Sequence, residues 1–144
     1  MSHSFQFLED IALADIAFEA EGDSVEELFR GATQALLETL ANPTTVGTSW
    51  THRITKMDED AASLLFEWLS EIVYWKDAAG VVINVAPLTV TSENGKWTLL
   101  SNLVGAPVDR QFQELRNDVK GITKHLYDMR QHGDQWMARV VLDV

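Results

Sequence analysis

The chain has 144 residues, of which 46% are hydrophobic, and it contains no cysteine. This length and apolar content suit one compact domain over residues 1–144, and the lack of cysteine excludes disulfides, thiolate zinc sites and cysteine nucleophiles. The formal net charge of −11 disfavours nucleic-acid binding, which depends largely on basic groups, and it favours cations and basic protein surfaces as partners.

Segments that direct a protein out of the cell or into a membrane are not recognisable in the sequence. The first ten residues, MSHSFQFLED, hold no basic cluster and no long apolar run. The longest apolar stretches elsewhere are too short to cross a bilayer. We therefore expect a cytoplasmic protein without a membrane partner.

A strand and a helix are the first regular segments that the sequence predicts. Residues 15–22, DIAFEAEG, alternate between apolar and polar side chains, which predicts a half-buried strand. Apolar residues then recur at helical spacing over 25–40, and Ser24 with Glu27 three residues later forms a capping-box pattern. We expect an amphipathic helix over 25–40.

A second strand and a second helix follow. Residues 50–57, WTHRITKM, predict a strand. The next stretch, DEDAASLLFEWLSEIVYWKD, has helical periodicity, with a cap near Asp58 or Asp60 and an end near Gly80. The expected apolar face of this helix consists of Leu64, Leu65, Trp68, Leu69, Ile72 and Val73.

The remainder of the chain has the alternation and the turn residues of β-structure. The predicted strands are 81–92, interrupted at Pro87, then 96–105, 118–129 and 136–144, with tight turns at 94–95 and 133–134. Helices with an apolar stripe must cover a sheet face. We therefore expect an α+β protein, a two-layer sandwich in which two helices pack on one face of a mostly antiparallel sheet.

Four motifs together resemble the archease family. The stretch LADIAFEAEGDSVEELFRGA is similar to the family's signature strand, turn and helix, and LLFEWLSEIVYW is similar to its second helix. DVKGITKH resembles the family's Glu-Val-Lys-Ala-x-Thr-Tyr-His strand, and WMARVVLDV resembles its closing strand, which ends in Asp plus one residue. Order and spacing agree from about residue 7 to the end of the chain.

The resemblance implies both a fold and a role. Archeases are accessory proteins of the RtcB-type RNA ligase, which joins RNA ends in tRNA splicing and RNA repair. The resemblance thus implies that the chain helps such a ligase through its guanylylation step and its repeated turnovers. It also implies the two-layer fold described above and a divalent-metal site built from carboxylates.

Several positions depart from the family pattern. Many archeases carry Asp-His-Thr-Ala-Asp before the first strand, where this chain reads IALAD over 11–15 and keeps only the last acidic residue, Asp15. The replacements are Ile11 for the acidic residue, Ala12 for His, Gly121 for Ala, Lys124 for Tyr and Gln113 for a His expected before that strand. Lys120 and His125 match the family motif, and their roles stay open.

The residues carried over as metal ligands are Asp15, Asp143 and Val144. Asp15 begins one predicted strand and Asp143 ends another. If these strands are antiparallel neighbours, the two carboxylates and the α-carboxylate of Val144 meet at one rim of the sheet. Such oxygen ligands suit a hard divalent cation, Ca²⁺ or Mg²⁺, with Mn²⁺ as a further choice.

Three interpretations remain open at this stage. Asp is also common at strand ends for purely structural reasons, since it caps turns and blocks edge pairing. The chain has no Gly-rich phosphate loop and no Gly-x-Ser-x-Gly motif, so we do not expect an enzyme. Besides the ligase accessory protein, the alternatives are a metal-dependent phosphoester hydrolase and a chaperone or scaffold that needs no metal.

Overall fold

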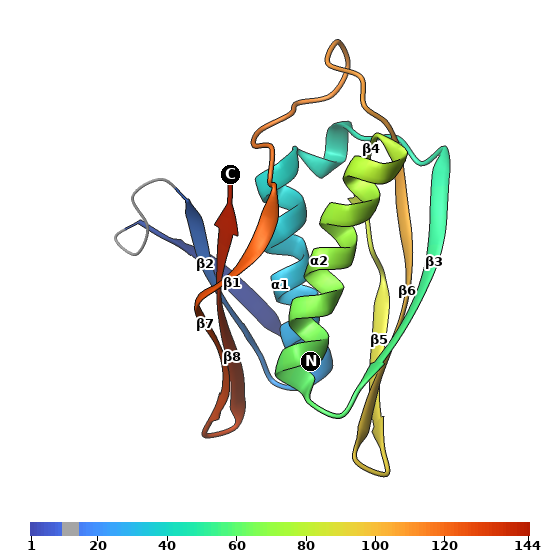
Figure 1. Cartoon of the computed structure of the whole chain (residues 1–144). Coiled ribbons are helices and arrows are strands. Elements are labelled where there is room, and N and C mark those ends of the chain that lie inside the picture. The colour runs from blue at the N-terminus through green and yellow to red at the C-terminus, as the bar shows by residue number, and fades with distance from the viewer. Residues whose placement is uncertain (10–14) are drawn as a thin grey trace.

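The computed structural model describes residues 1–9 and 15–144 (Figure 1). Its elements in chain order are β1 (His3–Leu8), β2 (Ile16–Gly22), α1 (Val25–Leu40), the 3₁₀ turn η1 (Pro43–Thr45), β3 (Trp50–Asp58), α2 (Ala61–Ala79), β4 (Val81–Val85), β5 (Leu88–Glu93), β6 (Lys96–Pro107), β7 (Gly121–His132) and β8 (Gln135–Asp143). Within the described residues the strands form two antiparallel sheets, one in the order β1-β2-β8-β7 and one in the order β3-β6-β4, with β5 also paired to β6.

The two helices lie between the two sheets in Figure 1, and each helix contacts strands of both. This confirms the α+β class, the two helices and the antiparallel pairing. The expectation of one sheet with the helices on one face needs correction, because the strands divide into two sheets. The physical reason is that β3, β4 and β5 all pair with the long strand β6, which leaves β8 to join β2 and β7 on the other side of the helices.

Both helix starts confirm their predicted caps. The Ser24 side chain accepts a hydrogen bond from the Glu27 main-chain N–H at 3.1 Å, and α1 begins directly afterwards. The Asp60 side chain accepts from the Ser63 N–H at 3.2 Å and caps α2. At its far end α2 stops at Gly80, which has the left-handed conformation that glycine adopts readily (φ 63°).

The core forms around the apolar faces of the two helices and the inner faces of the sheets. Every residue of the expected α2 face is buried, and Trp68 is completely so. The Trp68 indole N–H donates to the Thr33 hydroxyl at 2.8 Å, and that hydroxyl donates to the Phe29 carbonyl at 2.6 Å. The single polar atom of this indole is therefore satisfied inside the core, as burial requires.

Helix α1 also covers the edge of the second sheet. Strands β4 and β5 both pair with β6 and are interrupted near Pro87, as the sequence predicts. The Arg30 side chain donates to the Leu88 carbonyl at 3.1 Å, and the Val90 N–H donates to the Glu26 carboxylate at 3.0 Å. Two main-chain groups of β5 are thus bound by side chains of α1.

Two features of the first sheet were not predicted. Strand β1 pairs along β2 from His3↔Gly22 to Leu8↔Ala17 and forms one edge. Strand β7, the other edge, is irregular between Thr123 and Asp128. The regular alternation of faces along a strand does not hold around His125, because an irregularity shifts the register of β7 there.

Candidate functional site

The strands that carry Asp15 and Asp143 are direct neighbours. Strand β2 pairs antiparallel with β8, and the register begins with Ile16 opposite Leu142. Asp15 immediately precedes Ile16, and Asp143 immediately follows Leu142. The expected antiparallel arrangement of these two strands is therefore confirmed, and the start of β2 lies at the same end of the first sheet as the end of β8 (Figure 1).

The local sequence explains why Asp143 faces away from the core. Leu142 and Val140 are completely buried and belong to the main hydrophobic core, as does Phe18 opposite Val140. Because side chains alternate along a strand, Asp143 lies on the opposite face from Leu142. Asp143 is exposed and Asp15 is half-buried, so both carboxylates are within reach of solvent.

Strand β7 completes this corner of the sheet. Gly121 pairs with Asp143, and the Lys120 main-chain N–H donates to the Asp143 carbonyl at 2.7 Å. The Lys120 side chain is exposed and lines a surface hollow together with Tyr74 and Asp77. His125 is exposed within the irregular part of β7, several residues further along the strand. The structure thus brings Lys120 to the aspartate pair through its backbone, and it does not do so for His125.

A cavity of about 480 Å³ lies beside Asp15. Its other wall includes Glu38 and Thr39 at the end of α1 and Arg116 and Asn117 from the loop before β7. The loop residues bind the free carbonyls of the helix end, since Arg116 donates to the Glu38 carbonyl at 2.9 Å and the Asn117 amide donates to the Thr39 carbonyl at 3.0 Å. Asp143 does not line this cavity.

Within the described part of the chain, the two aspartates have no ion-pair partner. Neighbouring carboxylates repel each other unless a cation or a proton intervenes. In the same part of the chain, no set of three or more His, Cys, Asp or Glu side chains is arranged to hold a metal ion. The oxygen ligands expected from the sequence are the two carboxylates and the main-chain oxygens of Val144, and the Glu9 and Glu38 side chains also line the cavity beside Asp15.

A basic and acidic cluster lies close to the start of β7. The Lys76 ammonium lies 2.8 Å from Asp77 and 2.8 Å from Asp118. The hydrogen bond from Lys76 and its charge lower the pKa of Asp118. Burial alone would lower the pKa of Lys76, but the hydrogen bonds that its ammonium donates to both carboxylates, together with their charges, outweigh it and raise the pKa. This cluster is internally paired and therefore serves to fix the chain before β7.

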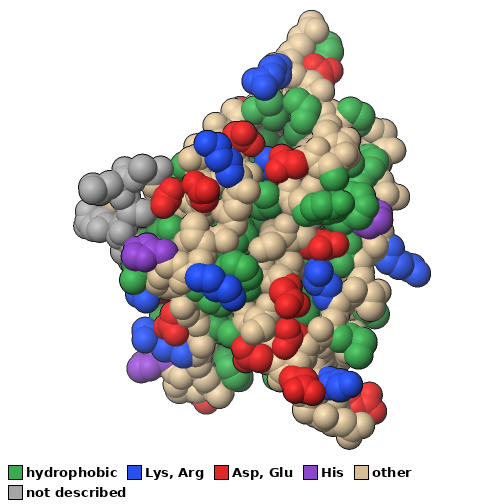
Figure 2. All heavy atoms as spheres, viewed as in Figure 1, with side chains coloured by type: hydrophobic (Ala, Val, Ile, Leu, Met, Phe, Trp, Pro, Cys, Tyr) green, Lys and Arg blue, Asp and Glu red, His purple; other side chains and the backbone are tan. Residues whose placement is uncertain are grey.

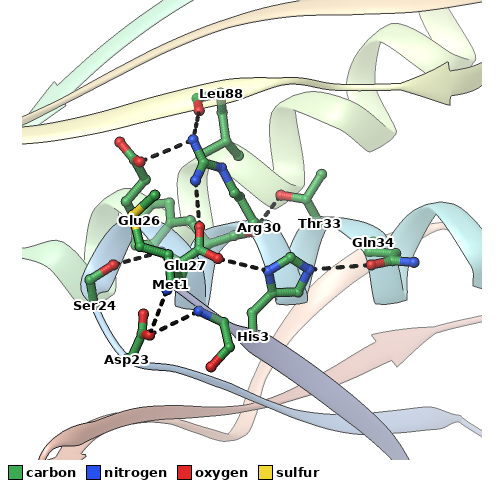
Figure 3. A network of polar contacts seen from close by, with 12 residues as sticks. Met1, His3, Asp23, Ser24, Glu26, Glu27, Arg30, Thr33, Gln34 and Leu88 are labelled. Atoms are coloured by element: carbon green, nitrogen blue, oxygen red, sulfur yellow. Dashed lines mark hydrogen bonds and ion pairs between the residues drawn. The ribbon is translucent and has the colours of Figure 1, made fainter.

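A second polar network, which the sequence did not predict, surrounds the start of α1 (Figure 3). Glu27 is almost fully buried and pairs with Arg30, and its carboxylate lies 3.2 Å from the His3 ring. The other ring nitrogen of His3 lies 3.4 Å from the Gln34 amide oxygen. The hydrogen bond from Arg30 lowers the pKa of Glu27 against the opposing effect of burial. The sequence signal for this network is the spacing of Glu27 and Arg30, which lie one helical turn apart.

Other positions that depart from the family pattern have structural roles where they are described. Gln113 accepts from the Asp109 N–H at 2.8 Å and donates to the Pro107 carbonyl at 3.0 Å, so it organises the loop after β6. The Lys124 ammonium lies 3.8 Å from the centre of the Phe66 ring. Ile11 and Ala12 lie outside the described residues.

Sequence comparison relates the whole domain to one family. The model of the archease protein family (MTH1598/TM1083) matches residues 5–144. The protein archease of Pyrococcus furiosus is 30% identical over 132 residues, which cover 91% of this chain and 93% of that protein. The protein archease of Methanothermobacter thermautotrophicus is 26% identical over 140 residues, which cover 97% of this chain and 98% of that protein.

Solved structures agree with this relationship. The solution structure of protein 1598 of Methanobacterium thermoautotrophicum superposes with a TM-score of 0.80 at 27% identity and covers 97% of this chain and 98% of that one. The crystal structure of an archease, described as a possible chaperone, from Thermotoga maritima gives a TM-score of 0.56 at 25% identity and covers 92% and 93% of the two chains.

Among the described helices, none is long and apolar enough to pass through a membrane.

Proposed function

The chain belongs to the archease family, and we propose on that premise that it is an accessory protein of an RtcB-type RNA ligase in tRNA splicing or RNA repair. In this role it promotes guanylylation of the ligase and multiple turnover, and it is not itself the enzyme. The observation that carries the proposal is the family match over residues 5–144. We place its action in the cytoplasm.

The proposed functional centre is a divalent-metal site formed by Asp15, Asp143 and the main-chain oxygens of Val144. Support comes from the pairing of Ile16 with Leu142, which makes the two aspartates neighbours at one end of the sheet. The ligand set consists of oxygen atoms alone, which suits Ca²⁺, Mg²⁺ or Mn²⁺. With so few protein ligands the ion keeps several waters. A bound cation would offset the charge of the carboxylates and present a positive centre to anionic groups of a partner.

The remaining residues of the corner position this centre. The hydrogen bond from the Lys120 N–H fixes the Asp143 carbonyl, so the end of β8 is held at the start of β7. The overall charge of −11 opposes direct RNA binding and favours docking on the basic cleft that a ligase needs for RNA and GTP. The carboxylates would thus reach the ligase through contact between proteins.

The test is multiple-turnover ligation by a purified RtcB-type ligase with and without this chain. We expect the wild-type chain to raise the number of turnovers, and the pair Asp15→Ala with Asp143→Ala to abolish that stimulation. Asp134→Ala is the matched control, because Asp134 is exposed in the turn at the opposite end of the β7–β8 hairpin. Absence of stimulation by the wild-type chain would overturn the proposal.

A metal-independent chaperone or scaffold is the second candidate. It is favoured by the description of the Thermotoga maritima relative as a possible chaperone. Stimulation that persists in the double aspartate variant and in the presence of a chelator would support this function. Calorimetric titration with Ca²⁺, Mg²⁺ and Mn²⁺ then shows separately whether the aspartates bind a cation.

A further inference from the structure

The loop over residues 108–120, between β6 and β7, projects from the body of the molecule at the top of Figure 1. Phe112 lies in this loop with 71% of its surface exposed, and Val108 at the base of the loop is 45% exposed. Apolar side chains are also visible on the projecting end of the molecule in Figure 2. A large aromatic ring in water costs solvation free energy, which burial against a partner would recover.

The tip of the loop is held rigid by its own hydrogen bonds. The Gln113 N–H donates to the Asp109 carbonyl at 3.0 Å, and the Asp109 N–H donates to the Gln113 side-chain oxygen at 2.8 Å. The Gln111 N–H donates to the Asp109 carboxylate at 3.0 Å, and the Gln113 amide donates to the Pro107 carbonyl at 3.0 Å. These bonds close the chain on both sides of Phe112, so the phenyl ring is presented by an ordered turn.

The base of the loop is fixed to the domain. Leu115 forms a bridge with Ala41 and packs with Val46 and Val82 in a small second core. The Arg116 N–H donates to the Leu40 carbonyl at 3.0 Å at the end of α1. A side chain on such a support loses little conformational freedom on binding, and this is the property of an interface anchor.

The loop also connects the ring to the aspartate corner. Arg116 and the next residue, Asn117, line the cavity beside Asp15. The loop ends at Lys120, whose N–H binds the Asp143 carbonyl at 2.7 Å. Phe112 and the two aspartates therefore belong to one end of the molecule and are joined by a fixed segment of chain.

The chemistry of the tip favours a protein partner. Phe112 lies between two glutamines, with Arg110 nearby, and the Asp109 carboxylate accepts the Gln111 N–H. The net charge of −11 opposes an RNA phosphate backbone, and a lone ring with one arginine beside it gives little of the basic groove that single-stranded RNA requires. An apolar pocket on a protein surface matches the ring better.

We propose that Phe112 is the docking anchor of this chain and inserts into an apolar pocket on the RNA ligase, beside the place where Asp15 and Asp143 meet it. This inference rests on the proposed function and adds the contact surface to it. The anchor supplies affinity, and the aspartates act at the same interface without depending on the ring for cation binding.

The experiment compares Phe112→Ala with Met57→Ala in binding to the purified ligase and in multiple-turnover ligation. Met57 is a suitable control because it is 58% exposed and lies on β3 of the other sheet. We expect Phe112→Ala to weaken binding to the ligase by roughly 30-fold, as truncation of an aromatic hot spot does, and Met57→Ala to change it less than about twofold. Phe112→Trp retains most of the affinity. Both alanine variants keep the wild-type melting temperature and calorimetric Ca²⁺ affinity.

Each contrary outcome has a separate meaning. Wild-type binding and stimulation by Phe112→Ala overturn the anchor and leave the accessory function intact. If the wild-type chain neither binds nor stimulates the ligase, the proposed function fails and the anchor on the ligase fails with it. If Phe112→Ala abolishes binding of single-stranded RNA in the absence of ligase, the ring contacts RNA. If Phe112→Ala converts a dimer to a monomer in sedimentation, the ring contacts a second copy of the chain. Either result overturns docking on the ligase.

Discussion

Acidic side chains lie in opposite environments at the two ends of the unit formed by β2 and α1. At the start of α1 the Glu27 carboxylate is buried and has Arg30 and His3 as partners (Figure 3). At the other end Asp15 and Asp143 flank the paired residues Ile16 and Leu142, and no ion pair among the described residues includes either of them. The first arrangement has its counter-charges within the fold, whereas the second is the place where we propose that a cation binds.

The largest effect is expected from removal of the Glu27 carboxylate at the start of α1. Glu27→Ala removes the carboxylate and leaves the Arg30 guanidinium and the His3 ring without their shared partner. We expect the free energy of unfolding to fall by about 3 kcal/mol, measured by urea denaturation. Glu67→Ala is the control, since Glu67 is exposed on α2 away from this network, and it should change stability by less than about 0.5 kcal/mol. Equal effects of both changes would contradict the structural role of Glu27.

The next effect concerns the aspartate end. A cation at 100 times its Kd should raise the free energy of unfolding by about 2.7 kcal/mol, which corresponds to a rise in melting temperature of roughly 5 to 10 °C. Asp15→Asn with Asp143→Asn should remove this rise. Differential scanning calorimetry with Ca²⁺ and with a chelator measures it, and a rise that survives in the double variant locates the cation elsewhere.

Acid titration sharpens the comparison further. The pKa of Glu27 is lowered in the folded chain from an ordinary value of 4.5, so its stabilising effect is present above that pH and is lost as the pH falls through the folded pKa. The wild-type chain should therefore lose stability below about pH 4.5, by up to about 1.4 kcal/mol for each unit by which the pKa is lowered. Glu27→Gln should flatten the acid limb of a plot of stability against pH. An unchanged slope in this variant would assign the acid limb to other groups.

The smallest effect on stability is expected for Asp143→Asn when no metal ion is present. Asp143→Asn removes one of the two carboxylates that flank the Ile16–Leu142 pair and keeps the shape of the side chain. In a chelator the free energy of unfolding should stay within about 0.5 kcal/mol of wild type or rise slightly, because charge repulsion is relieved. A loss of more than about 1 kcal/mol in urea denaturation would mean that Asp143 has a structural partner.

Local chemistry made much of the fold predictable. Ser24 and Asp60 cap the helices as expected because each side-chain oxygen satisfies a main-chain N–H a few residues away. The turn at Asn94 and Gly95 formed because both residues tolerate positive φ, here 53° and 77°. Such signals depend on neighbours in sequence, and so a single sequence contains them.

Features that depend on distant pairing were not predictable in the same way. Nothing in the sequence of β6 shows that β3, β4 and β5 all pair with it, and so the second sheet was missed. The irregularity in β7 depends on Leu126, a residue that rarely adopts the positive φ of 58° found here. The neighbourhood of Asp15 and Asp143 was anticipated through the family resemblance, and their binding of a cation stays a prediction.

The contacts between α1 and β5 have a consequence for the behaviour of the protein in concentrated solution. An uncovered strand edge is a template on which another chain can add its own strand, and this is the first step of fibrous aggregation. The Arg30 and Glu26 side chains already occupy the Leu88 carbonyl and the Val90 N–H. A helix that packs the core therefore also keeps neighbouring molecules from extending the sheet.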